Sequence, residues 1–485
     1  LKAILTPEEL ERIQAMPTES LEAYEAYLIG KKHLSDRTTE SLSMAIDRFN
    51  EATQLDPEFS LAWIGLANSR YLHTFYTGKS TADDDHPAVR TALMTALELN
   101  PDAGEAYATL GLLELDKEVA ERHFRRAIEL RPNYANAYIW YSLLLRHEGR
   151  IDEALNLLQT AVKLDPMSIL VRVNLAVVFR MLGRFDDAWE ELHKAIDINP
   201  DSMGARDAIA TMHYQVFNRH ELAVKEYGIM FAARPEVTRW YVWLAQLYLD
   251  MNARDRAEKL IGIVNESNPG SSYSAWGNLL LGLQHGSAKS IEDDAQLLLR
   301  ADGLGPDHWI GQFAAGQLRN IAMQEGRLDD ARQVYAKYYP ELLSSRDPMI
   351  NSANYRAAID LALVLQRTGD SARAEKLLQL CAGYISDLPR LGWWRGYWIS
   401  DVQILALQGR SAEALDSLWQ AIDEGWRVFW WYYLNHEPNL EPILAEPALI
   451  ATREEIEVEM MAKMQRVREM EDAGEIGLVA GVDSD

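Results

Sequence analysis

Residues 148–166 read EGRIDEALNLLQTAVKLDP, and this stretch decides the fold. Ala154, Leu158 and Ala161 stand twelve, eight and five residues before Pro166. Spacings of four and three place the three apolar side chains on one face of a helix, and the proline ends that helix. The glycine near the start adopts a left-handed conformation at low cost, which suits the end of a preceding helix. The stretch therefore predicts two helices joined by a short turn.

The same arrangement recurs along most of the chain. Successive prolines are separated by 44, 31, 34, 34, 35, 34 and 37 residues and stand at positions 57, 101, 132, 166, 200, 235, 269 and 306. The positions twelve, eight and five residues before each of these prolines are apolar, with Asp294 as the exception. Similar glycine turns read LGRFDDA from 182, EGRLDDA from 325, TGDSARA from 368 and QGRSAEA from 408. A unit of this length cannot bury its apolar face alone, so the units must stack.

Composition and charge exclude several classes of function. The chain has 485 residues, a formal net charge of −25 and one cysteine, Cys381, which we expect in the core. Such an acidic chain has no general attraction to nucleic acid or anionic lipid, so we expect no nucleic-acid partner. No apolar run is long enough to span a bilayer, so we expect no membrane insertion of this segment. Because the chain opens at Leu1 without Met or a signal peptide, we expect a fragment of a longer polypeptide.

Motifs for catalysis or cofactor binding are missing from the sequence. GxxxxGKS/T, GxGxxG, GxSxG and HExxH do not occur. The acidic cluster at residues 83–86 lacks the spacing of a calcium loop, and we interpret it as a solvated loop. His213 and His220 are seven residues apart across an expected turn, which does not suit a shared metal. We therefore expect no enzymatic activity, no catalytic residue, no metal and no cofactor.

Three stretches resemble the first helix of the tetratricopeptide repeat, with the alanines, aromatic residues and prolines above in its second helix. They read WIGLANSRY from Trp63, YATLGLL from Tyr107 and YVWLAQLY from Tyr241. The resemblance covers roughly residues 20–425. It implies an all-α, right-handed superhelical solenoid of about eleven helical hairpins. Two departures are Arg172 and Arg206, which occupy first-helix positions where the family usually has a bulky apolar residue.

Glycine content suggests how the array is divided. Seven glycines lie between residues 270 and 311, and the proline register loosens after 306. We predict an N-terminal array over residues 1–306, a degenerate C-terminal array over 307–425, and a terminal region over 426–485. One degenerate unit inside a continuous solenoid is the alternative.

The terminal region opens with an aromatic run, GWRVFWWYY, at residues 425–433. The last unit of an array must cover apolar surface without a neighbour, so we predict a structural cap made of aromatic residues and proline turns. An aromatic ligand site formed with WWRGYW at 393–398 is the alternative, and nearby glutamates disfavour a membrane-dipping loop. Residues 449–472 predict a helix docked on the last unit through a stripe of Ile456, Met460, Met464 and Val467, with a partner contact as the alternative. We expect the tail from 474 to be disordered.

The two ends of the chain add a second resemblance. The opening LTPEELERIQAMPTESLEAYEAYLIGKKHL, the repeat array and the ending DEGWRVFWWYYLNHEPNLEPIL look like the C-terminal half of certain bacterial multidomain regulators. In those proteins a class III nucleotide cyclase or a winged-helix domain precedes the array. This resemblance implies a regulatory arm that binds a small ligand, and a periplasmic location if the regulator is anchored in a membrane.

The leading hypothesis is an interaction scaffold that holds a peptide or helix of a partner protein in its concave groove, in the cytoplasm. In tetratricopeptide proteins the first helices line that groove, and equivalent residues form ridges. The positions that match this lining are Trp140, Asn174, Ala208 and Trp243; Leu143, Val177, Thr211 and Gln246; and Arg146 with Arg180. Arginine beside aromatic surface suits a partner that carries carboxylates. The sequence does not predict an oligomeric state.

Overall fold

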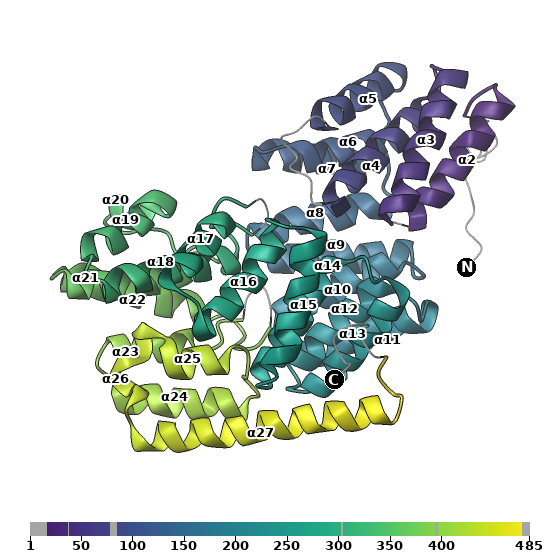
Figure 1. The fold of residues 1–485 in the computed structure, drawn as a ribbon. Coiled ribbons are helices and arrows are strands. Elements are labelled where there is room, and N and C mark those ends of the chain that lie inside the picture. The colour runs from purple at the N-terminus through teal and green to yellow at the C-terminus, as the bar shows by residue number, and fades with distance from the viewer. Residues whose placement is uncertain (1–16, 37, 78–84, 302–303, 393–395, 478–485) are drawn as a thin grey trace. The chain divides into compact units, whose positions relative to one another are not determined.

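The computed structural model describes residues 17–36, 38–77, 85–301, 304–392 and 396–477 (Figure 1). Over these residues the chain is built from helices and contains no β-strand, so the prediction of an all-α helical-repeat fold is confirmed. The chain divides into two compact units, Leu1–Val171 and Arg172–Asp485. We describe each unit by itself. The opening residues 1–16 and residues 83–84 of the acidic cluster lie outside the described residues.

The first unit consists of paired helices whose large and small residues fit together. Phe49 is fully buried, and its ring lies so close to Gly30 and Gly65 that a Cβ at either glycine would overlap it. Phe124 fits against Gly111 in the same way. The helices are α2 (Leu21–Asp36), α3 (Thr39–Leu55), α4 (Ser60–Thr77), α5 (Asp85–Leu99), α6 (Gly104–Leu113), α7 (Lys117–Leu130), α8 (Ala135–His147) and α9 (Ile151–Leu164).

The second unit continues the pairing. Its helices are α10 (Ile169–Met181), which begins in the first unit, α11 (Phe185–Ile198), α12 (Met203–Gln215), α13 (His220–Ala233), α14 (Thr238–Asp250), α15 (Arg254–Ser267), α16 (Ser272–His285), α17 (Ala288–Leu298), α18 (Trp309–Gln324) and α19 (Leu328–Tyr338). They continue as α20 (Pro340–Ser344), α21 (Tyr355–Arg367), α22 (Ser371–Ile385), α23 (Ser400–Leu407), α24 (Ser411–Asp423), α25 (Trp430–His436), the 3-10 turn η1 (Pro438–Leu440), α26 (Glu441–Leu444) and α27 (Pro447–Asp472).

The number of repeats agrees with the sequence. In chain order, α2 to α19 and α21 to α24 form eleven successive helix pairs within the described residues. The two arginines that depart from the family pattern are explained by ion pairs between the helices of their own hairpins. Arg172 on α10 lies 2.7 Å from Glu191 on α11, and Arg206 on α12 lies 2.7 Å from Glu226 on α13. A charge pair thus replaces an apolar contact in two consecutive repeats.

One hydrophobic core runs through most of the second unit, from Ala210 to Ile476. Buried side chains continue through the glycine-rich residues 270–311, among them Trp276, Leu298 and Ile310. The structure divides after Val171, and no division falls at residue 306, where the core of the second unit is continuous. The boundaries that we predict from the sequence, after residues 306 and 425, differ from this division and stay a prediction.

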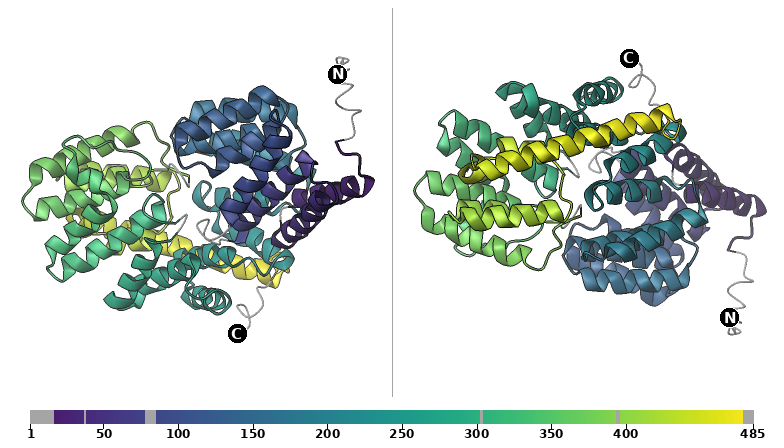
Figure 2. Two further views of the ribbon diagram at one scale, coloured as in Figure 1. Left: turned by 90° about the horizontal axis from the view of Figure 1, so that it is seen from above. Right: turned by 90° about the horizontal axis from the view of Figure 1, so that it is seen from below.

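The last long helix, α27, reaches further back than the sequence predicts. Its stripe of Ile456, Met460, Met464 and Val467 is buried, as expected. However, the helix contacts α13 as well as α26, so it does not dock on the last hairpin alone (Figure 2). Arg256 on α15 donates two hydrogen bonds to Glu471, of 2.5 and 3.0 Å. Beyond the helix, Ile476 is buried against Gly228 on α13, while residues 478–485 lie outside the described residues.

His213 and His220 are both buried. The described residues contain no group of three or more His, Cys, Asp or Glu side chains that could hold a metal ion. His213 packs edge-on against Trp189, with ring centroids 5.1 Å apart, and burial lowers the pKa of His213 to about 4.

This histidine predicts a loss of stability in acid. Between pH 6.5 and 4 the unfolded chain binds a proton at His213 that the folded chain does not, so the free energy of unfolding falls as the pH falls. We expect His213→Phe to reduce this fall by about 2 kcal/mol between pH 7 and pH 5, measured by urea denaturation. His193→Phe is the matched control, because that side chain is exposed. Parallel pH profiles for wild type and His213→Phe would contradict the prediction.

Candidate functional site

The aromatic run folds back onto the first helices of earlier hairpins in the second unit. We call residues 426–440 the aromatic segment. The ring of Phe429 lies 5.8 Å from those of Trp276 on α16 and Phe313 on α18, and 6.0 Å from that of Trp309. Phe429 adopts the left-handed conformation with φ 55°, which costs a non-glycine residue about 1 kcal/mol. Packing on these rings offsets that cost, so the segment fills the face that first helices would offer to a partner.

A single buried carboxylate anchors the segment to α14. Trp431 donates a hydrogen bond from Nε1 to Asp250 Oδ1 at 3.0 Å, and Trp430 donates to the Asp250 carbonyl oxygen at 2.8 Å. The Tyr214 hydroxyl donates to Asp250 Oδ2 at 2.5 Å. Burial raises the pKa of Asp250 to about 8, although these side-chain hydrogen bonds act in the opposite direction. The anchor therefore combines strong local hydrogen bonding with complete removal from water.

A buried arginine holds the other end of the segment. Arg319 on α18 is fully buried and lies 3.3 Å from Asp360 Oδ1 and 3.2 Å from Glu437 Oε1. It also donates to Asn439 Oδ1 at 2.8 Å, and Asn439 donates to Asp360 Oδ1 at 2.6 Å. Burial raises the pKa of both carboxyl groups, and the guanidinium lowers it. Two acidic groups thus share one arginine.

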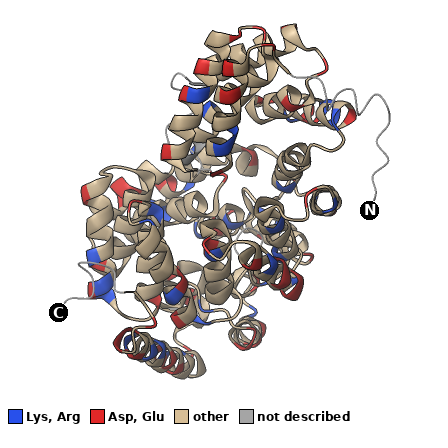
Figure 3. Ribbon diagram, turned by 90° about the vertical axis from the view of Figure 1, so that its right-hand side faces the viewer, with Lys and Arg blue, Asp and Glu red and all other residues tan. Residues whose placement is uncertain are grey.

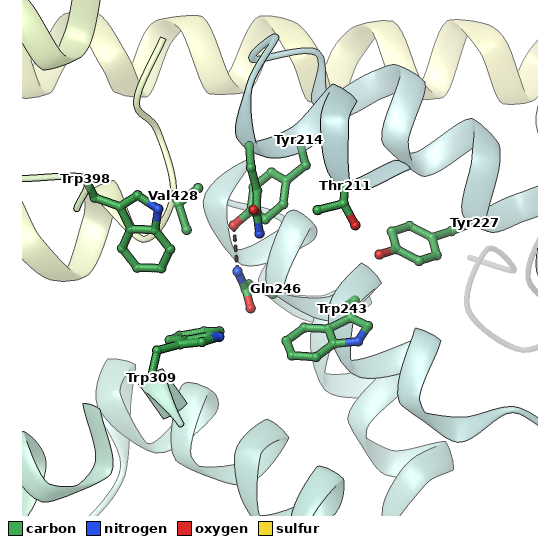
Figure 4. Close-up of a pocket in the computed structure, with 9 residues that line it drawn as sticks. Thr211, Tyr214, Tyr227, Trp243, Gln246, Trp309, Trp398 and Val428 are labelled. Carbon is green, nitrogen blue, oxygen red and sulfur yellow. Dashed lines mark hydrogen bonds between the residues drawn. The ribbon is translucent and has the colours of Figure 1, made fainter. Parts of the chain in front are cut away.

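The segment leaves a small cavity beside it, which we call the aromatic cavity (Figure 4). Its closed volume is about 10 Å³, close to that of one water molecule. Among the described residues, no charged side chain lines it. The lining residues are Thr211, Tyr214, Gln215, Tyr227, Trp243, Gln246, Trp309, Trp398 and Val428.

Three of these residues carry buried polar atoms without a hydrogen-bond partner among the described residues. Gln246 donates from Nε2 to the Tyr214 hydroxyl at 2.7 Å, and its Oε1 points into the space between Trp309 and Trp243 (Figure 4). Gln215 Oε1 and Trp309 Nε1 are likewise without partners. Three residues that line the cavity thus carry an unpartnered buried polar atom, and the cavity volume suits one water molecule.

A second cavity of about 30 Å³ shares Trp309 and Trp398 with the first. It is polar, and Gln312, Gln317, Arg356, Asp360, Gln403 and Glu437 contribute to its lining. Positive charges offset the negative ones there, because the charges of Arg319 and Arg356 both lower the pKa of Asp360. We call it the polar cavity.

The predicted groove residues fall into three groups. Thr211, Trp243 and Gln246 line the aromatic cavity together. On α10, Asn174 and Val177 are half-buried and Arg180 is buried, with Asp207 acting on its charge. In the first unit Trp140 is buried, whereas Leu143 and Arg146 are half-buried. Whether any of them contacts a partner stays a prediction.

Sequence reasoning missed four lining residues, namely Tyr214, Gln215, Tyr227 and Trp309. Tyr214 lies three residues after Thr211 and could have been found by extending that ridge by one helical turn. Trp309 opens the first helix after the proline register loosens, whereas Trp398 and Val428 belong to the two aromatic stretches that the sequence offers as an alternative ligand site. Residues 393–395 of the second aromatic stretch lie outside the described residues.

The distribution of charge and the hydropathy of the helices complete the description of the surface. Acidic and basic residues are interspersed along the helices (Figure 3). In the described part of the chain, no helix is both long and apolar enough to cross a membrane.

Comparisons with known proteins agree with the helical-repeat architecture. Models of the tetratricopeptide repeat match residues 145–210, 115–169 and 355–379. Anaphase-promoting complex subunit 3 of Schizosaccharomyces pombe is 27% identical over 139 residues, which are 28% of this chain and 19% of that protein. The chain thus matches about a fifth of the length of that relative.

Among solved structures, PilF of Pseudomonas aeruginosa is 22% identical, covering 45% of this chain and 96% of that one, with a TM-score of 0.35. A thermophilic tetratricopeptide protein of Thermus thermophilus is 21% identical, covering 39% and 99%, with a TM-score of 0.34. Human IFIT1 in a dimer with PPP-AAAA is 18% identical, covering 65% and 73%, with a TM-score of 0.37.

The fold and the recurring hairpins define a helical-repeat protein that offers binding surfaces. The chain contains tetratricopeptide repeats, which the family models match over residues 115–210 and 355–379. Such repeats serve as scaffolds for protein–protein interaction, and this chain is such a scaffold. The resemblance to multidomain regulators and the absence of enzymatic activity stay predictions.

Proposed function

We propose that the chain is an interaction scaffold whose partner protein contacts the second unit at Trp243, beside the aromatic cavity. The observation that carries this proposal is the position of the aromatic segment. Phe429 and Tyr432 already occupy the face of α18 on which a partner helix would lie. A helix or long peptide could bind there only after the segment left, whereas the half-buried ring of Trp243 can be contacted without that change.

The composition of the cavity supports a role in recognition. Tryptophan and tyrosine dominate the residues that carry most binding energy in protein interfaces, because they bury large areas at small entropic cost. Trp243 is half-buried, so part of its ring is open to a partner. Thr211 and Gln246 add polar groups, which in binding sites commonly fix the orientation of the bound group.

The arginine ridge is less suited to a carboxylate than the sequence suggests. Burial lowers the pKa of Arg180 to about 10, and Asp207 opposes that change as a nearby negative charge. A partner carboxylate would have to compete with Asp207 for a guanidinium that is already removed from water. A partner with carboxylates stays a prediction, and we favour a site that does not depend on Arg180.

The test is a binding measurement with the full chain and a purified partner, first identified by co-purification. We expect Trp243→Ala to weaken binding by more than tenfold, because truncating a central aromatic residue commonly costs about 2 kcal/mol or more. Trp189→Ala is the matched control, since Trp189 is also half-buried in the second unit but lies outside the cavity. Melting temperatures of both variants show whether the fold is retained.

Two outcomes would overturn the proposal. Unchanged affinity of Trp243→Ala, with loss of binding in Trp140→Ala or Leu143→Ala, would place the partner on the first unit. Alternatively, a small metabolite could raise the melting temperature while no protein co-purifies. That result would favour the sensory arm.

A further inference from the structure

The outward face of α27 carries an exposed apolar pair. The helix lies along the outside of the second unit, and its buried stripe already packs against the rest of that unit (Figure 2). On the opposite face, Val458 is 68% exposed and Met461 is 56% exposed. Two residues three positions apart are neighbours on a helix surface, so they form one patch. Scattered apolar residues need no explanation, so the residues around this pair decide whether it marks a contact.

The pair is the centre of a regular line of side chains, which we call the outer stripe. Its members follow one another at spacings of three, four, three, four and three residues, and all of them are exposed. This alternation keeps one line of side chains facing a second helix along the whole contact, as in a coiled coil, and it extends over about 25 Å of helix. The outer stripe consists of Ala451, Glu454, Val458, Met461, Gln465 and Arg468.

The outer stripe is complementary to itself when one copy is reversed. The spacings read the same from either end, so an antiparallel second helix centred between Val458 and Met461 brings each of these residues against the other. In that register Glu454 of one copy meets Gln465 of the second copy, and Arg468 lies one helical turn further on. An amide and a guanidinium therefore stand near a carboxylate at both ends of the contact, and both groups donate hydrogen bonds to carboxylates.

The charges at the two ends of the outer stripe are left over by the fold. In the described part of the chain, the side chains of Glu454 and Arg468 form no ion pair or hydrogen bond. Arg466, beside the stripe, is instead paired with Glu469 at 3.1 Å. A parallel second copy would set Glu454 against Glu454 and Arg468 against Arg468, which is repulsive. The charge pattern thus favours a second copy in the antiparallel direction.

From this pattern we infer that α27 is a self-association surface, on which the α27 of a second copy of this chain docks antiparallel through the outer stripe. The inference goes beyond the proposed function, because it concerns another surface and another partner. Trp243 lies on α14 and is not part of the outer stripe. Two copies joined in this way present two equivalent surfaces, so a partner that carries two recognised segments gains affinity over a partner that carries one.

The experiment is sedimentation equilibrium of the full chain over a range of concentrations, in about 0.15 M salt, which screens the repulsion between two acidic chains beyond about 8 Å. We expect the measured mass to rise from that of one chain toward that of two. The double variant Val458→Glu, Met461→Glu places like charges of both copies at the centre of the contact. We expect it to raise the dissociation constant of the dimer about a hundredfold, because central residues carry most of the binding energy.

Met349→Glu is the matched control for this variant. Met349 is 78% exposed in the same unit but lies outside α27, so its substitution should leave the dissociation constant unchanged. A mass of one chain at every concentration would overturn the inference. A dimer that tolerates the substitutions at Val458 and Met461, or that Met349→Glu weakens equally, would overturn it as well.

An exchange of charges tests the antiparallel direction. Glu454→Arg alone, or Arg468→Glu alone, brings like charges together at both ends of the contact, so we expect each variant to form the dimer about tenfold more weakly. A mixture of these two variants pairs opposite charges again, and so does the double variant Glu454→Arg, Arg468→Glu. Both should restore the dissociation constant to within about threefold of the wild-type value. Single variants without effect, or an exchange that restores nothing, would overturn the inference.

The outcomes separate this inference from the proposed function. Every substituted side chain is exposed, so unchanged melting temperatures show that the fold of each variant is retained. Trp243→Ala should leave the mass of the dimer unchanged, because it does not alter the outer stripe. A chain that binds its partner through Trp243 but stays at the mass of one chain keeps the proposed function and loses the self-association surface, and the opposite result keeps the surface and loses the proposed function.

Discussion

Arg319→Met is expected to lower the free energy of unfolding of the second unit by about 3–5 kcal/mol, because it leaves the buried Glu437 and the half-buried Asp360 without their shared cation. Asp360 and Glu437 both lie within 3.3 Å of the guanidinium. Without it, the two acidic groups must be protonated or must separate. The aromatic segment would then lose its anchor on α18. Urea denaturation followed by circular dichroism measures the effect.

A nearby arginine provides the control for this substitution. Arg327 also has two acidic neighbours, Glu325 and Asp330, but all three side chains are exposed. Because exposed ion pairs contribute little, Arg327→Ala should change stability by less than about 1 kcal/mol. The triple variant Arg319→Met, Asp360→Asn and Glu437→Gln should recover much of the loss. A small effect of Arg319→Met alone would show that burial of this cluster is not what holds the segment.

The second large effect is expected from Phe429→Ala, at about 3–5 kcal/mol. The ring is fully buried and contacts aromatic side chains on α16 and α18, so its removal opens a cavity where several hairpins meet. Phe217→Ala is the control, since Phe217 is half-buried in the same unit. Equal effects of the two substitutions in a thermal melt would mean that the aromatic segment is not packed on the first helices.

The hairpins could be predicted because their signals are local. Ala154, Leu158 and Ala161 all lie on one helix, and each stays fully buried in the structure. The same holds for Cys381, which is buried as expected. Periodic spacing reports such local contacts directly.

The path of the C-terminal region could not be predicted, because its contacts join distant parts of the chain. The aromatic run is buried, as expected for surface-covering residues, but nothing in GWRVFWWYY indicates that Trp430 and Trp431 meet Asp250, about 180 residues earlier. Asp250 itself follows LAQLYL and gives no sign of burial in the sequence. Composition therefore predicts that a segment covers apolar surface, but not which surface.

The candidate site shows the same limit. Thr211, Trp243 and Gln246 could be grouped from the sequence because they lie where the repeat register is regular, and all three line the aromatic cavity. Trp309 could not be added to them, because it follows an irregular stretch and only the folded chain brings it to the cavity. The free atoms of Gln215 and Gln246 depend on hydrogen bonds among several helices, which no spacing rule reports.

The return of α27 to α13 and α15 has a consequence for how this protein can change in evolution. An open array tolerates the gain or loss of a repeat, since each unit contacts only its neighbours. Here Arg256 and Glu471 meet across 215 residues of chain. One more hairpin between them would add a step of rotation and translation that carries the end of the chain away from its partner helices. Duplication of a single repeat, the usual route by which such genes lengthen, would therefore break the closure rather than extend the array.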